Sequence, residues 1–91
     1  MSERRVAIVR ITNKRGLHAR ASAKVVEAAA RFQSEITVTK DGQAVNARSI
    51  MGLMMLAASL GSEVEIAAVG PDSEEAMAAI LALADAKFGE E

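Results

Sequence analysis

Two hydrophobic periods alternate along this chain, and their order constrains the fold more than any other feature. A period of two residues, typical of half-buried strands, indicates four strands, and a period of 3.6 residues, typical of amphipathic helices, is clear in two of the three segments that we expect to be helical. The segments follow one another as β-α-β-β-α-β-α. This order predicts an α+β fold, a two-layer open-faced sandwich in which three helices cover one face of a four-stranded, mainly antiparallel sheet.

The predicted strands are short and rich in β-branched residues. Asp41-Gly42 separates two of them and is a strong hairpin signal, which is why we expect a mainly antiparallel sheet. In the first strand, Ala7, Val9 and Ile11 share the face that we expect to be buried. The four strands span residues 5–12, 34–40, 43–47 and 63–69.

The first two predicted helices differ in regularity. Residues 19–32 carry a regular apolar stripe and many alanines, which form helices readily. The second helix is less regular because it contains Gly52. Ser49 is the expected cap at its start, and Gly61 is the expected end.

The third predicted helix has clear start and stop signals. It follows Pro71, begins with Asp72 or Ser73 as its cap, and stops at Gly89. Its predicted buried stripe contains Met77, Ile80, Leu81, Ala84 and Phe88.

Composition narrows the class of protein. The 91 residues suit a single domain, 1–91, whose core is aliphatic because only two residues are aromatic. Eleven basic and twelve acidic residues leave a net charge of −1, which disfavours nucleic-acid binding. The absence of cysteine excludes disulfides and thiolate metal sites. The first apolar run is too short, and too interrupted by arginine, for a signal peptide or a membrane span, so we expect a cytoplasmic protein. We also expect a monomer that needs no metal or cofactor.

The single histidine lies where a predicted loop meets the first predicted helix, in the segment GLHARA. The first turn of a helix leaves N–H groups unpaired and carries partial positive charge, which suits an anion. Gly16 permits a sharp turn before the helix, and the guanidinium of Arg20 matches phosphate oxygens. Because a neutral imidazole is a nucleophile near neutral pH, we predict that His18 accepts a phosphoryl group, held by the backbone amides of Ala19 and Arg20 and by the Arg20 side chain.

A second interpretation remains open on these residues alone. A lone histidine near a helix start is often a surface polar residue, and the chain would then be a small α+β regulatory or interaction module in which His18 is not phosphorylated. A metal site is disfavoured because the chain has no other histidine and no cysteine.

Two segments resemble the signatures of a known family. NKRGLHARASAKVV is similar to the phosphorylation-site segment of the histidine-containing phosphocarrier protein, HPr, of bacterial phosphoenolpyruvate-dependent phosphotransferase systems. ARSIMGLMMLAASLG is similar to its second signature, which surrounds a regulatory serine. The resemblance covers nearly the whole chain, and the order of elements matches. It implies a phosphoryl carrier that accepts phosphate from enzyme I and passes it to an enzyme IIA, rather than a self-sufficient catalyst.

The resemblance also implies roles for individual residues. His18 falls on the phosphorylated histidine, which uses Nδ1, and Arg20 on the arginine that attends the phosphoryl group and helps to dock acidic partners. Ser49 falls on the serine that an HPr kinase/phosphorylase modifies in some bacteria. The family usually has proline where this chain has Ala21, which restores an N–H donor and relaxes the loop.

The apolar run after Ser49 is too continuous for a one-sided helix. We predict that Met51 and Met54 form part of a partner-binding patch, since exposed methionines suit adaptable surfaces; the alternative is core packing. The segments GLHARASAK and SIMGLMMLAAS look closer to the nitrogen-related branch of the family, which regulates rather than transports.

Overall fold

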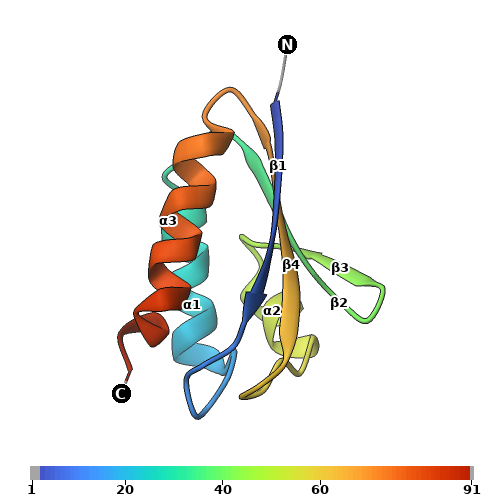
Figure 1. Cartoon of the computed structure of the whole chain (residues 1–91), viewed down its shortest axis with the longest axis vertical. Helices are drawn as coiled ribbons and strands as arrows, with labels where there is room; N and C mark the ends of the chain where they lie inside the picture. The colour runs from blue at the N-terminus through green and yellow to red at the C-terminus, as the bar shows by residue number, and fades with distance from the viewer. Residues whose placement is uncertain (1–2, 91) are drawn as a thin grey trace.

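A four-stranded antiparallel sheet and three helices make up the computed structural model, which describes residues 3–90 (Figure 1). Met1, Ser2 and Glu91 of the predicted domain 1–91 lie outside the described residues. The fold class and the order of elements are confirmed. In chain order, the elements are β1 (Glu3–Arg10), α1 (Ala19–Ala29), β2 (Glu35–Lys40), β3 (Gln43–Asn46), α2 (Ile50–Met55), β4 (Glu63–Gly70), α3 (Ser73–Asp85) and a short turn, η1 (Lys87–Gly89).

The strands lie in the order β1-β4-β2-β3, and every neighbouring pair is antiparallel. The predicted hairpin joins β2 to β3, with Val38 opposite Val45. Both turn residues have positive φ, 51° at Asp41 and 82° at Gly42, as a tight two-residue hairpin requires. The turn therefore sets the pairing register of β2 and β3, in which the apolar side chains of β2 point toward the helices.

Helices α1 and α3 lie side by side on one face of the sheet, and α2 packs against α1 and β3 (Figure 1). The layer between sheet and helices is aliphatic, as predicted. Alternate residues of the central strand β4 point into this layer, and so does the apolar stripe of α1. The buried residues from these two elements and from β2 are Ala21, Val25, Ala28, Ala29, Ile36, Val38, Val64, Ile66 and Ala68.

The predicted elements are longer than the observed ones at several ends. Strand β1 ends at Arg10 rather than at residue 12, and α1 ends at Ala29 rather than at residue 32. Helix α2 ends at Met55, well before Gly61, because the chain turns at Ala57, where φ is +53°. Helix α3 ends at Asp85 rather than at Gly89, because positive φ at residues 87 and 88 interrupts it.

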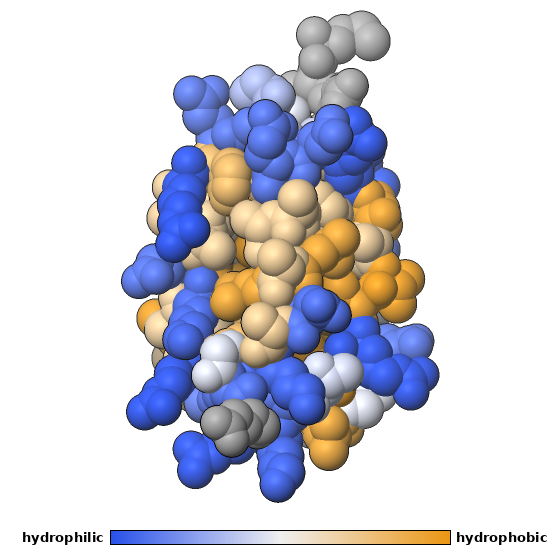
Figure 2. Space-filling view, turned by 60° about the vertical axis from the view of Figure 1, so that its left-hand side comes forward, coloured by the Kyte–Doolittle hydropathy of each residue, from blue (hydrophilic) through white to orange (hydrophobic). Residues whose placement is uncertain are grey.

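The prediction that Leu81 is buried with the α3 stripe is wrong, since its exposed fraction is 36%. Leu81 lies on the flank of α3 that faces the edge strand β1, and together with Ile8 it lines an open groove there. Among residues 3–90, no further strand pairs with that edge of the sheet. Figure 2 shows the resulting apolar surface across the middle of this face, with hydrophilic residues above and below it.

Asp72 occupies the predicted cap position of α3, but its side chain does not cap the helix. Its carboxylate instead accepts hydrogen bonds from the backbone N–H groups of Gln33 (2.9 Å) and Ser34 (2.8 Å) and from the Ser34 hydroxyl. The Ser34 hydroxyl, and next the Gln33 amide, hold the pKa of Asp72 below its usual range. Asp72 thus ties the α1–β2 loop to the start of α3.

This contact predicts a pH-dependent contribution to stability. Asp72→Ala should lower the free energy of unfolding near neutral pH, and the difference from wild type should shrink with acidification. A carboxyl whose pKa is lowered on folding stabilises the fold above its unfolded pKa, about 4, and loses this contribution as the pH falls through its folded pKa. Urea unfolding from neutral pH to below about pH 4 measures the difference. Glu75→Ala, at an exposed acid in the same turn, is the control; a difference for Asp72→Ala that is constant with pH would contradict the assignment.

Candidate functional site

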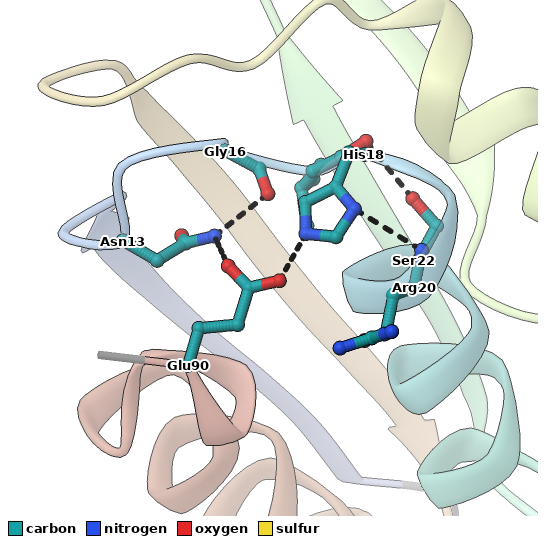
Figure 3. A network of polar contacts seen from close by, with 7 residues as sticks. Asn13, Gly16, His18, Arg20, Ser22 and Glu90 are labelled. Carbon is teal, nitrogen blue, oxygen red and sulfur yellow. Dashed lines mark hydrogen bonds and ion pairs between the residues drawn. The ribbon is translucent and has the colours of Figure 1, made fainter.

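His18 begins α1 as its N-cap, at the predicted junction of loop and helix. Its carbonyl accepts the first intrahelical hydrogen bond, from Ser22 N–H at 2.8 Å. Its Nδ1 atom accepts a hydrogen bond from the backbone N–H of Arg20 at 3.2 Å (Figure 3). The imidazole therefore takes the part that a serine or aspartate side chain usually plays at a helix start. One ring nitrogen is thereby aimed at the amides of the first turn, where Ala19 and Arg20 were predicted to hold an anion.

The loop before His18 is fixed by a close backbone approach. Gly16 has φ +65°, and a Cβ atom placed there would lie 2.2 Å from the carbonyl oxygen of Ala58. The next residue, Leu17, donates its N–H to that same oxygen at 2.9 Å. The Ser22 hydroxyl donates to the Leu17 carbonyl at 3.1 Å and links the loop to the helix behind it. The predicted role of Gly16 as the sharp turn is confirmed.

A carboxylate that the sequence did not indicate completes the site. Glu90 contacts Nε2 of His18 through one carboxylate oxygen and accepts a hydrogen bond from the Asn13 side-chain amide at 2.8 Å through the other (Figure 3). The same Asn13 amide nitrogen donates to the Gly16 carbonyl at 2.8 Å. The Asn13 hydrogen bond is the main cause that lowers the pKa of Glu90; burial opposes it, and the hydrogen bond and charge of His18 add to it.

The imidazole is only partly exposed. The exposed fraction of the His18 side chain is 23%, and that of Glu90 is 16%. The Arg20 side chain is exposed. Arg20 and Glu90 both line a shallow hollow beside the imidazole. Three cationic side chains and one carboxylate line it, and this excess of positive charge favours anions. The hollow is lined by Lys14, Arg15, Arg20, Gly89 and Glu90.

The second predicted segment also has the expected local structure. Ser49 is the N-cap of α2, and its hydroxyl oxygen accepts a hydrogen bond from Gly52 N–H at 2.9 Å. Gly52 lies close under this cap, because a Cβ atom there would come within 3.0 Å of the Ser49 Oγ and of Val45. The glycine that made this helix irregular in sequence thus accommodates the cap.

The apolar residues of α2 divide between core and surface. Leu53 and Leu56 are buried, whereas Met51 is 69% exposed and Met54 is 42% exposed. Core packing is therefore wrong for both methionines, and their exposure meets the first requirement of a docking patch. Ile50 is exposed as well.

Comparison with known proteins decides the family. The model of the family described as "PTS HPr component phosphorylation site" matches residues 6–86. The chain belongs to the HPr family. The predicted function, a phosphocarrier of the phosphotransferase system, is confirmed by this membership.

Individual HPr proteins are similar over most of their length. The phosphocarrier protein HPr of Cupriavidus necator is 54% identical over 80 residues, which cover 88% of this chain and 90% of that protein. The phosphocarrier protein NPr of Shewanella violacea is 43% identical over 82 residues, which cover 90% of this chain and 90% of that protein. The crystal structure of HPr from Thermoanaerobacter tengcongensis matches with a TM-score of 0.92 and 48% identity, over 96% of this chain and 98% of that one.

Ala21 is fully buried in the first turn of α1, and because it is not proline it has an N–H that can donate at the helix start. Within residues 3–90, no group of three or more histidine, cysteine or acidic side chains is placed to hold a metal ion. No helix in that range is long and apolar enough to cross a membrane.

The close approach at Gly16 can be tested against a matched glycine. Gly16→Ala should destabilise the protein more than Gly42→Ala, by about 1–3 kcal/mol, the usual cost of overpacking. Both substitutions place alanine at positive φ, but a Cβ atom at Gly42 has no neighbour within 4 Å, whereas at Gly16 it meets Ala58. Urea unfolding of the two variants measures the difference. Equal destabilisation would show that the loop does not depend on this contact.

Proposed function

We propose that His18 is the residue on which this HPr protein carries the phosphoryl group. The observation that carries the proposal is the direction of Nδ1, which accepts the Arg20 N–H at the start of α1 and so faces the unpaired amides of that turn. A phosphoryl group bonded to Nδ1 adds negative charge where the helix dipole and the backbone amides of Ala19 and Arg20 stabilise it. The exposed Arg20 guanidinium supplies the fixed positive charge beside it.

We further propose enzyme I as the donor and an enzyme IIA as the acceptor, with the protein acting in the cytoplasm as a monomer. The exposed residues Arg20, Met51 and Met54 form the docking surface in this proposal. They combine a cation for acidic partners with flexible apolar side chains for transient contacts. Packing of α2 against α1 supports one continuous surface. That the protein belongs to the nitrogen-related branch of the family stays a prediction.

Ser49 is the proposed regulatory site, for a kinase/phosphorylase of the HPr type. The hydroxyl already caps α2, so a phosphate there adds nearly two negative charges at the helix that carries Met51 and Met54. That charge would repel acidic partners that Arg20 attracts. Regulation would then act on docking and leave the His18 geometry unchanged.

Radiolabelling tests the site. Incubation with labelled phosphoenolpyruvate and a cognate enzyme I should give an acid-labile, base-stable phosphate on the wild-type protein and none on His18→Ala. Arg20→Ala should accept label more slowly, by about tenfold, because hydrogen bonds and charge at a phosphoryl group are worth about 1.5–3 kcal/mol. Normal labelling of His18→Ala would exclude the assigned residue, and no labelling of the wild type would favour the interaction-module interpretation.

Docking can be tested separately from chemistry. Met51→Asp and Ser49→Asp each add a carboxylate to the proposed surface and should raise the KM for this protein as a substrate of enzyme I by about tenfold, because unmatched like charge weakens association. Ile8→Asp is the control, since Ile8 is 64% exposed and lies in β1, at the opposite edge of the sheet from β3, against which α2 packs. A KM that responds equally at all three positions would contradict a localised docking surface.

A further inference from the structure

The contacts of His18 distinguish its two ring nitrogens. Nδ1 accepts a hydrogen bond from the Arg20 N–H and so carries no proton in the neutral ring. The ring proton is therefore on Nε2, which donates it to Glu90. The Asn13 amide, itself completely buried, holds the second oxygen of Glu90. A chain of contacts thus runs from Asn13 through Glu90 to the edge of the imidazole opposite Nδ1 (Figure 3).

The backbone that delivers Glu90 is unusual. Lys87, Phe88 and Gly89 all have positive φ, at 55°, 55° and 78°, and two of the three are not glycine. Such conformations persist only where surrounding structure holds them, and here the Phe88 side chain is buried with 3% exposure. A Cβ atom at Gly89 would lie 2.4 Å from the Lys24 ammonium of α1. Phe88 therefore anchors the segment after α3 in the core, and Gly89 lies close against Lys24 of α1.

We propose that Glu90 is a positioning residue for phosphoryl transfer at His18. Its carboxylate keeps the ring proton on Nε2 and so leaves Nδ1 unprotonated, with its lone pair as the nucleophile. This inference rests on the proposed function of His18. It assigns to Glu90 the orienting part that a buried carboxylate plays beside the histidine of a catalytic triad.

The transfer step shows why the proton has to stay on Nε2. The Nδ1 lone pair forms the N–P bond, the bond between phosphorus and the donor breaks, and its electron pair leaves with the donor. The imidazole now carries a positive charge, which the carboxylate of Glu90 stabilises. In the onward step the acceptor attacks phosphorus, the N–P bond breaks, and its electron pair returns to Nδ1. With the Nε2 proton in place the leaving group is a neutral imidazole; without it the leaving group would be an anion.

The position of Glu90 favours this role over a blocking one. The carboxylate lies at Nε2, whereas the incoming phosphoryl group approaches Nδ1 on the other edge of the ring. The nearby cationic residues Lys14, Arg15 and Arg20 line the same hollow and offset the charge of Glu90. Glu90 therefore acts on the proton of the ring without occupying the site of bond formation.

The tautomer of His18 is the first readout. Because the chain has a single histidine, long-range ¹H–¹⁵N spectra of the ring give one set of signals that needs no further assignment. The neutral wild-type ring should show Nε2 protonated and Nδ1 unprotonated, and Glu90→Ala should show a mixture of the two tautomers. Glu75→Ala is the matched control, because it removes the same charge from the opposite end of α3.

The rate of phosphorylation is the second readout. Potassium phosphoramidate, a small donor that needs no docking surface, should phosphorylate Glu90→Ala about tenfold more slowly than wild type, the low end expected for loss of a hydrogen bond to a charged group. Glu75→Ala should react like wild type. Support requires both the mixed tautomers and the slower reaction of Glu90→Ala.

Other results separate this inference from the function on which it rests. An unchanged tautomer, an unchanged rate, or a faster reaction of Glu90→Ala overturns the positioning role, and the faster reaction would identify the carboxylate as a block. Enzyme I phosphorylating the wild-type protein in the same preparations would then leave the carrier function standing. Failure of enzyme I to phosphorylate a wild-type protein that reacts with phosphoramidate would instead overturn the carrier function.

Discussion

The site depends on one hydrogen bond, from the backbone N–H of Arg20 to Nδ1 of His18. A helix start is usually capped by a serine, threonine, aspartate or asparagine side chain, which satisfies an unpaired amide. Here an imidazole nitrogen does this, and the atom that caps the helix is the same atom that we propose as the nucleophile. When a phosphoryl group takes the place of the lone pair, its oxygens meet amides that the helix cannot pair internally. Capping and anion binding are thus two uses of the same backbone geometry.

The rest of the molecule holds that geometry in place. The close approach of Gly16 to Ala58 fixes the loop against the connection between α2 and β4, and α1 packs against α2 and α3. Across the site, the buried Phe88 anchors the left-handed turn that carries Glu90 back to the ring. The site around His18 therefore draws on three parts of the chain: the start of α1, the connection between α2 and β4, and the turn after α3. A small aliphatic domain suffices for this because each part is anchored by backbone contacts or by a buried side chain.

The sequence predicted what depends on local pattern. Hydrophobic periods gave the order of elements, Asp41-Gly42 gave the β2–β3 hairpin, and GLHARA gave the position of His18 at a helix start. Tertiary contacts decided what the sequence could not predict. Leu81 fits the helical stripe, yet it lies exposed beside the edge strand β1. Asp72 fits a cap, yet its carboxylate binds the α1–β2 loop. Glu90 is 72 residues from His18, beyond the predicted end of the last helix, and no local signal connects the two.

The central claim is that the amides at the start of α1 receive the phosphoryl group on His18. Amide proton shifts of the ¹⁵N-labelled protein, compared before and after phosphorylation, test this most directly. The account predicts that the N–H signals of Ala19 and Arg20 move downfield more than any others, because each gains a charged acceptor in place of water or a ring nitrogen. Unchanged signals at these two positions, in a protein shown to be phosphorylated, would contradict it.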